Sequence, residues 1–351
     1  MLDAGSKKPT TGWPPRLSAV PTVAGSVAPK GSCRIGVQMS ELERHGVGVT
    51  RIDAGIRSRT GAVTDTSIGP GGDAKSSDNN MSEIPARGLG PLIDTHAHIY
   101  PRHTPLIEGA THRPSRDVTA EEYLRTLDQH GVLFGVHAAA SFMGPYNDYT
   151  LAALARHRRL RGTAIVDPSV SLPELQAMAA AGIVGIRFSL RDYKTTPDLG
   201  SPEYRRLLRR VADLGWHVHV YAEGERIAAL TTQLLAAEVD IVIDHYGNPV
   251  PNLGENSPGF QAALRAIGSG RGWVKLSAPY RSPGCDHAAL AARLLAEGGA
   301  ERLLWASDWP FVGHESKVTY RQMVESFEQV MPDPVVREKI GRTAVRLYKF
   351  A

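Results

Sequence analysis

The sequence of 351 residues predicts an α/β fold, a distorted (β/α)8 or TIM barrel, over residues 89–351. From residue 92 onward, short apolar runs alternate with amphipathic helical patterns, and the alternation occurs eight times. Eight strand–helix units in about 250 residues match the size of such a barrel. A doubly wound sheet is the alternative. That fold often carries a glycine-rich phosphate-binding turn after its first strand, and this sequence has none there.

Each expected strand is short, rich in β-branched or other apolar residues, and ends at a polar or turn-forming residue. The eight segments are 92–98, 134–140, 163–167, 183–189, 217–222, 240–245, 273–278 and 303–308. A capping box at Thr119–Glu122 predicts the start of the first helix, which continues to about residue 130. The later helices are expected at 147–157, 171–181, 202–214, 224–236, 258–267, 286–297, 316–330 and 334–347.

Residues 1–88 differ in composition from the barrel segment. They are rich in Gly, Ser, Thr and Pro and show no sustained periodicity, which predicts a disordered or poorly structured extension. Met81 stands just before the periodic pattern begins. It is a candidate natural start, and residues 1–80 are then an upstream addition that is not part of the native protein.

Composition and charge narrow the class of protein. The chain is 42% hydrophobic and 22% charged, and it contains neither an apolar run of membrane-spanning length nor a signal-peptide pattern. Cys33 and Cys285 are isolated from each other, which favours a reducing, cytoplasmic location over a disulfide framework. The pI is about 9.0, but residues 1–80 hold 10 Lys and Arg against 7 Asp and Glu. The nearly neutral remainder lacks the basic stripe of a nucleic-acid-binding protein.

Polar residues follow three of the expected strands at the end where such barrels hold their active sites. His96 and His98 are two apart on the first strand, so both side chains point to one face. His245 follows the sixth strand and Asp308 the eighth. Convergent imidazoles bind a metal or an anionic oxygen, and a carboxylate accepts a proton from water or ligates a metal. Singly, Asp308 is typical of a helix N-cap and His245 of a core histidine, but their joint occurrence favours an active site.

The fifth expected strand carries His217, His219 and Tyr221 on one face. If that face points inward, His219 and Tyr221 lie near the mouth of the barrel. If it points outward, the two side chains pack beneath the next helix. The sequence leaves both orientations open.

Arginines in and after the strands point to an anionic substrate. Arg187 stands inside an apolar strand, and Arg281 follows the seventh strand. A buried guanidinium needs an anion, and its planar fork matches a carboxylate. An ion pair with Asp192 or Asp286 is the structural alternative. Arg191 begins a loop and is a weaker candidate.

Five segments in order, DTHAHIYP, GIRFSL, VIDHYGNPV, VKLSAPYR and ASDWPF, resemble the amidohydrolase-related (amidohydrolase 2) group of metal-dependent hydrolases. Within this group the sequence is most similar to the 2-pyrone-4,6-dicarboxylate lactonases and related sugar lactonases, over about residues 90–350. The resemblance implies hydrolysis of a lactone or a related carboxylated small molecule. It also implies a set of site residues: His96, His98, His245 and Asp308 as the mechanistic core, and Arg187 and Arg281 as carboxylate anchors. Ser141 and Tyr100 follow the second and first strands, where they are expected to line the same pocket.

The resemblance leaves the metal open. Binuclear members take a carboxylated lysine from strand four, where this sequence has Arg187 and no lysine, so a bridged two-metal site is not expected. One alternative is a single divalent ion such as zinc, held by His96, His98, His245 and Asp308, with His219 as a further ligand. The other is a site without metal, as in the pyrone lactonases, which also lack that lysine. A nearby guanidinium favours the metal-free alternative.

The preferred hypothesis is hydrolysis of a carboxylated lactone, either like 2-pyrone-4,6-dicarboxylate or a sugar lactone, with Asp308 as general base. A metal-dependent, non-oxidative decarboxylase of an aromatic or unsaturated acid is the first rival. A barrel that binds its ligand without catalysis is the second, but such a protein is expected to have lost one of the four strand-end groups. The sequence does not indicate an oligomeric state.

Overall fold

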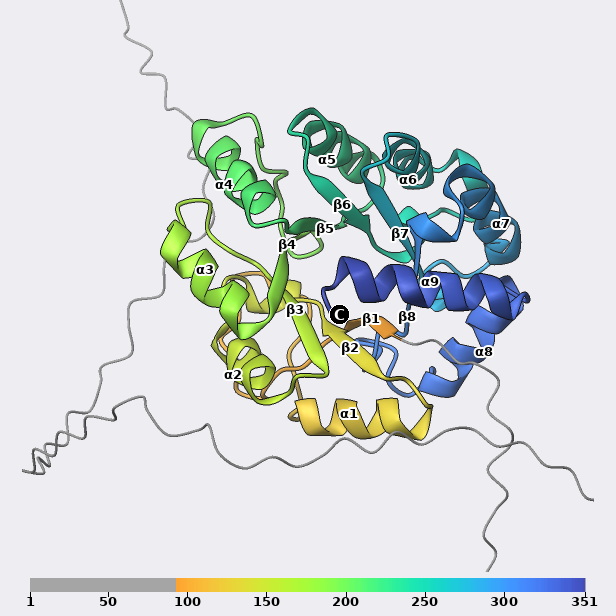
Figure 1. Cartoon of the computed structure of the whole chain (residues 1–351), viewed down its shortest axis with the longest axis horizontal. Coiled ribbons are helices and arrows are strands. Elements are labelled where there is room, and N and C mark those ends of the chain that lie inside the picture. Colours follow the sequence, from red (N-terminus) through yellow and green to blue (C-terminus); the bar gives the residue numbers. More distant parts are fainter. Residues whose placement is uncertain (1–92, 351) are drawn as a thin grey trace, which may run out of the picture. The chain divides into compact units, whose positions relative to one another are not determined.

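The computed structural model describes residues 93–350, which form a barrel of eight parallel strands with helices between them (Figure 1). The strands are β1 Ile93–Ala97, β2 Phe134–His137, β3 Leu160–Ala164, β4 Ile183–Ser189, β5 His217–Tyr221, β6 Asp240–Ile243, β7 Gly272–Ser277 and β8 Leu303–Ala306. The helices are α1 Ala120–Gln129, α2 Asp148–Arg156, α3 Leu172–Ala181, α4 Pro202–Asp213, α5 Glu225–Ala236, α6 Pro258–Gly268, α7 His287–Gly298, α8 Tyr320–Val330 and α9 Pro334–Leu347. The predicted (β/α)8 fold is confirmed. The predicted extension, residues 1–88 with Met81, lies outside the described residues.

Strands β1 to β8 pair in sequence order, and the barrel closes between β1 and the segment that follows β8. His98 N donates to Trp309 O at 2.8 Å, and Asp308 N donates to His96 O at 2.9 Å. The buried Asp94 carboxylate joins the same two segments, because it accepts from Ser307 N at 2.9 Å and from Ser307 Oγ at 2.5 Å. This closure places the ends of β1 and β8 side by side, and it carries His96, His98 and Asp308 to one point.

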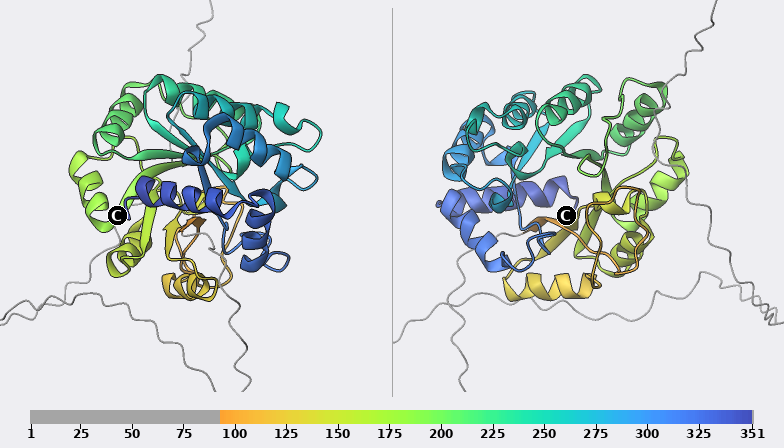
Figure 2. Two further views of the ribbon diagram at one scale, coloured as in Figure 1. Left: turned by 45° about the vertical axis from the view of Figure 1, so that its right-hand side comes forward. Right: turned by 180° about the vertical axis from the view of Figure 1, so that it is seen from behind.

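Helix α9 closes the opposite end of the barrel. Its Ala344, and Tyr348 directly after it, pack with interior strand residues such as Ile93 and Val242. In Figures 1 and 2 this last helix crosses the strands, and its C-terminal end reaches the middle of the barrel. Most of the remaining core lies between the strands and the surrounding helices. With the amino ends of the strands covered, a small molecule reaches the interior from their carboxyl ends.

The observed elements match the predicted ones closely, and the largest differences are in β2, β3 and α8. Strand β2 ends at His137, three residues before its predicted end. Strand β3 lies three residues earlier than predicted. It pairs with β2 from Leu160 and ends at Ala164, and the carbonyl of the next residue, Ile165, accepts a hydrogen bond of 2.9 Å from the side chain of Asn147. Helix α8 begins at Tyr320 and not at residue 316, because Thr319 and Gln322 form a capping box. None of the helices in the described part of the chain has the length and apolar content needed to cross a lipid bilayer.

Candidate active site

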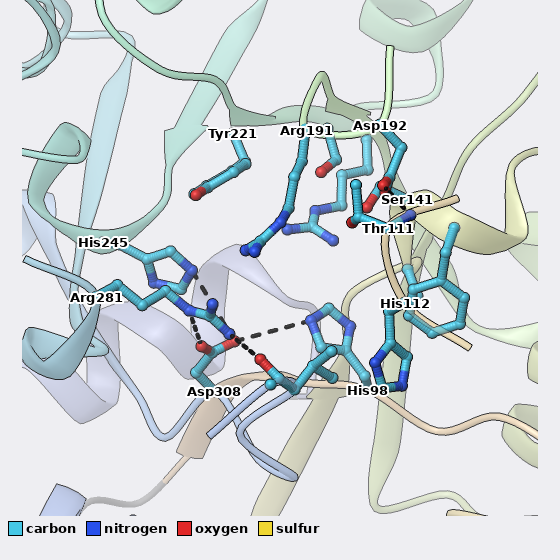
Figure 3. A pocket seen from close by; sticks show the side chains of 16 residues that line it. His98, Thr111, His112, Ser141, Arg191, Asp192, Tyr221, His245, Arg281 and Asp308 are labelled. Atoms are coloured by element: carbon cyan, nitrogen blue, oxygen red, sulfur yellow. Dashed lines mark hydrogen bonds and ion pairs between the residues drawn. The ribbon is translucent and has the colours of Figure 1, made fainter. Parts of the chain in front are cut away.

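A pocket of about 100 Å³ lies at the carboxyl ends of the strands. Its wall is mainly polar and comes from the loops after β1, β2, β4, β6, β7 and β8 and from the ends of β4 and β5 (Figure 3). The polar residues that line it are His98, Thr111, His112, Ser141, Arg187, Ser189, Arg191, Asp192, Tyr221, His245, Arg281 and Asp308. All of the predicted site residues except Tyr100, His96 and His219 are therefore in this wall.

Three imidazoles surround one oxygen of Asp308. Its Oδ1 lies 3.5 Å from His96 Nε2, 3.7 Å from His98 Nε2 and 3.9 Å from His245 Nε2. This oxygen is buried and accepts no hydrogen bond within the described residues. The Nε2 atoms of His96 and His98 are 3.2 Å apart. The residues predicted from three separate strand ends therefore meet at one point in the structure.

The other nitrogen of each ring determines what these Nε2 atoms can do. His98 Nδ1 lies 2.7 Å from Ala138 O, and His96 Nδ1 lies 3.0 Å from the Asp244 carboxylate, so both Nδ1 atoms carry hydrogen. Burial lowers the pKa of both rings, to about 3 for His98, so both rings are neutral. Their Nε2 atoms are then acceptors. His245 differs, because its Nδ1 lies 2.8 Å from Ser277 Oγ, and a hydroxyl can donate or accept.

The second oxygen of Asp308 is held by two donors. Tyr280 Oη and Arg281 Nε each donate to Oδ2 at 2.6 Å. Burial by itself would raise the pKa of Asp308, but the positive charge of Arg281 outweighs burial and holds this pKa well below its usual range. The backbone of Asp308 has φ 66°, a left-handed conformation that a non-glycine residue adopts at a cost. This turn directs the carboxylate into the barrel. The structure therefore does not use Asp308 as a helix N-cap.

A layer of charged groups lies directly beneath the imidazoles. The Asp244 carboxylate accepts a hydrogen bond from Arg187 Nη2 at 2.9 Å. It also contacts His219 Nε2 and lies 3.3 Å from Lys275 Nζ. Burial lowers the pKa of Lys275 to about 8. Burial would raise the pKa of Asp244, but His219, His96 and Lys275 hold it well below its usual range. Sequence reasoning gave no role to Asp244 or Lys275, although a lysine inside an apolar strand is the same signal that identified Arg187.

The two predicted anchors both pair with carboxylates of the barrel. Arg187 pairs with Asp244 and also donates to Ala139 O at 2.5 Å, while Arg281 pairs with Asp308. Neither contacts Asp192 or Asp286, the partners considered from the sequence. The Nε of Arg187 is buried without a hydrogen-bond partner in the described structure, and both guanidinium groups still line the pocket.

The remaining predicted residues divide into those that line the pocket and those behind it. Tyr221 and Ser141 line the pocket, so the face of β5 that carries Tyr221 points inward. His219 is on that face but lies deeper, against Asp244 and 3.5 Å from Thr163 Oγ1. Tyr100 differs from the expectation. Its backbone pairs with Val118 and its ring packs on Phe142 and His112, so it supports the wall from behind.

His96, His245 and Asp308 form a group whose donors and spacing suit one divalent cation, and His98 lies beside it. His96, His98 and His245 each offer an Nε2 beside Asp308 Oδ1, and their Nδ1 atoms are fixed by other groups, as is typical of metal ligands. The charge around this point is already positive, however. Arg187, Lys275 and Arg281 are three fixed cations against the two carboxylates Asp244 and Asp308. A divalent cation would add to that excess.

Comparison with known proteins places the chain among hydrolases. Residues 93–350 match the family model described as Amidohydrolase. The chain is 28% identical to a 4-sulfomuconolactone hydrolase from Hydrogenophaga intermedia, over 63% of this chain and 75% of the relative. It is also 28% identical to a 2-pyrone-4,6-dicarboxylate hydrolase from Comamonas testosteroni, over 62% of this chain and 76% of the relative. A solved structure from Acinetobacter baumannii, a probable 2-pyrone-4,6-dicarboxylic acid hydrolase with citric acid bound, is 31% identical. The match to this structure has a TM-score of 0.69 and covers 74% of this chain and 99% of the solved chain.

Proposed function

The chain belongs to the amidohydrolase family, and we propose that it hydrolyses a carboxylated lactone with Asp308 as general base. One observation carries the proposal: a buried carboxylate has one oxygen fixed by Tyr280 and Arg281, while the other has no hydrogen-bond partner in the described structure and faces three imidazoles. A group in that position removes a proton from water next to a bound carbonyl. The two relatives with lactone-hydrolase names support the same reaction.

In the proposed reaction, a water molecule donates one hydrogen to Asp308 Oδ1 and the other to the Nε2 lone pair of His96 or His98. Its oxygen attacks the lactone carbonyl carbon as its proton passes to Asp308. The Nε2 atom of neutral His245 can carry the ring hydrogen, because the Ser277 hydroxyl can donate a hydrogen bond to Nδ1 of the same ring. It therefore donates to the oxyanion that forms. The bond between this carbon and the ring oxygen then breaks, and Asp308 returns its proton to that oxygen.

The substrate carboxylate is proposed to bind Arg187 and Arg191. Arg187 presents its unpartnered Nε, and Arg191 lines the pocket without an ion pair in the described part of the chain. Arg281 pairs with Asp308, so it primarily holds the base. Tyr221 and Ser141 border the same space and supply hydroxyls for the ring. A bound metal would be held by His96, His98, His245 and Asp308, and there it would polarise the carbonyl oxygen as a Lewis acid.

A substrate panel tests the proposal. The wild-type protein is incubated with 2-pyrone-4,6-dicarboxylate, a muconolactone, and lactones of sugar acids, and ring opening is followed by proton release. We expect at least one carboxylated lactone to be opened, while the matching lactone without a carboxylate is opened much more slowly, because it lacks the group that Arg187 and Arg191 bind. Decarboxylation of 2,6-dihydroxybenzoate without any lactone opening would support the rival activity instead.

Metal removal separates the two alternatives for the cofactor. We expect lactone hydrolysis to survive exhaustive dialysis against a chelator with less than a twofold loss of kcat, because the cations Arg187, Lys275 and Arg281 already lie against the carboxylates Asp244 and Asp308. Metal content is measured on the same sample by elemental analysis. A loss of activity that zinc restores and magnesium does not would contradict this expectation, and it would assign the imidazoles to a metal.

A cytoplasmic location is part of the proposal. Cys285 is a free, half-buried thiol in the described part of the chain. An unpaired thiol is typical of a reducing compartment.

A further inference from the structure

We infer that the wall opposite Asp308 recognises hydroxyl groups of the substrate through Asp192 and His112, so that the preferred lactones carry one carboxylate and ring hydroxyls, not two carboxylates. This inference rests on the proposed lactone hydrolysis and specifies its substrate class. In Figure 3, Asp192, Thr111 and His112 lie on one side of the pocket, and His245, Arg281 and Asp308 lie on the other.

Four buried polar atoms of the residues that line the pocket have no hydrogen-bond partner in the described structure. They are Arg187 Nε, Asp308 Oδ1, His112 Nε2 and Asp192 Oδ2. Unpaired buried polar atoms are costly and cluster where a ligand completes them. The proposed reaction uses the first two, for the carboxylate and the attacking water. His112 Nε2 and Asp192 Oδ2 are on the wall opposite Asp308 and have no role in the proposed reaction.

Asp192 requires a hydrogen-bond donor from the ligand. Its Oδ1 accepts from Thr111 N at 2.8 Å, which fixes the carboxylate and leaves Oδ2 free. His112, on the same side of the pocket, packs on Phe142 and Tyr100, and its ring centroid lies 5.0 and 6.0 Å from theirs. A substrate hydroxyl can donate to Asp192, and another can accept from, or donate to, His112 Nε2. Ring hydroxyls therefore satisfy both atoms.

A second substrate carboxylate does not fit this wall. It would bring a negative charge to the free oxygen of Asp192 in a partly buried site, where like charges repel strongly. His112 does not neutralise it, because burial lowers the pKa of this imidazole and keeps the ring uncharged near neutral pH. Asp192 is the only acidic residue besides Asp308 among the described residues that line the pocket. It therefore discriminates against dianionic substrates at this end.

The test compares two substrates in wild type, Asp192→Asn and Asp192→Ala. One substrate is the 1,4-lactone of an aldaric acid, which carries one carboxylate and ring hydroxyls, and the other is 2-pyrone-4,6-dicarboxylate. We expect wild type to favour the aldaric lactone in kcat/KM. Both variants should raise its KM about tenfold, the cost of one hydrogen bond to a charged group, with kcat within about twofold. They should also lower the KM for the dicarboxylate. Asp198→Asn, an exposed change in the same loop, is the matched control and leaves both substrates unaffected.

Three results overturn the inference. If wild type opens the dicarboxylate faster than the aldaric lactone, or if the Asp192 variants leave the ratio of the two substrates unchanged, the far wall does not select hydroxyls. The proposed lactone hydrolysis stands in both cases. If wild type opens no lactone at all, the proposed function fails, and the inference fails with it.

Discussion

Asp308→Asn is expected to lower kcat for lactone opening by about a thousandfold, the range typical of a lost general base. The asparagine side chain has the same shape and still accepts hydrogen bonds from Tyr280 and Arg281, but it takes no proton from water. Binding of the ring-opened product should remain, and it should tighten for an anionic product, because the guanidinium of Arg281 loses the carboxylate that lies 2.6 Å from it. The measurements are steady-state kinetics on the lactone identified by the panel, and calorimetry with its product.

A matched control separates chemistry from folding. Asp286 caps helix α7 through a 2.9 Å hydrogen bond to Ala289 N and does not line the pocket, so Asp286→Asn should keep full activity. The thermal midpoint of Asp308→Asn is recorded alongside, because an unpaired Arg281 costs stability. A folded Asp308→Asn protein with near wild-type kcat would remove Asp308 from the mechanism.

The sequence predicted the strand ends well because a parallel barrel brings them together whatever the loops between them do. His96 and His98 were placed on one face by their spacing, and His245 and Asp308 by their position after a strand. The same logic applies to Arg187. These inferences need only local periodicity and the number of strands, and both can be read from the chain.

The depth of a side chain in the barrel, and the group that it contacts there, could not be predicted from periodicity and strand number. Lys275 and His96 are 179 positions apart in the sequence, yet Lys275 Nζ lies 3.5 Å from His96 Nδ1. Alternation gives the face on which a side chain lies, but it does not give its height along the barrel axis or the group opposite. That height determines that Arg187 pairs with Asp244, that His219 lies deeper in the barrel, and that Tyr100 lies behind the pocket wall. Asp192 was considered only as an ion-pair partner for the same reason.

Acidification is expected to destabilise the protein steeply between pH 6.5 and about pH 4. Six histidines are buried in the barrel: His96, His98, His137, His217, His219 and His245. Burial lowers the pKa of each below its usual value, to about 3 for His98 and His217 and about 4 for His245. In the unfolded chain these rings titrate near the ordinary pKa of about 6.5. The unfolded state therefore binds more protons as the pH falls, and folding loses free energy in that direction.

The magnitude follows from the number of groups. A ring that stays neutral in the folded state contributes about 1.4 kcal/mol of destabilisation for each pH unit below about 6.5. Several such rings together approach the whole stability of an ordinary domain, about 5–15 kcal/mol. Asp308 and Asp244 do not add to the loss in this window. Their folded pKa values are lowered, so their contribution is lost only as the pH falls below about 4.

Urea unfolding at pH 7.5, 6.5 and 5.5 measures the effect, and one variant isolates it. His217 lies outside the pocket, with its ring packed on Tyr348 at a centroid distance of 5.1 Å. His217→Gln should reduce the slope of unfolding free energy against pH by about one proton while lactone hydrolysis is unchanged. The exposed His103→Gln serves as the control, and it should leave the slope as in wild type. An unfolding free energy that stays constant from pH 7.5 to 5.5 would contradict this expectation, and one that rises toward pH 5.5 would mean that the buried imidazoles already carry charge in the folded protein. In that case, the Nε2 atoms of His96 and His98 would be hydrogen-bond donors, and the proposed assignment of the oxyanion to His245 alone would have to be abandoned.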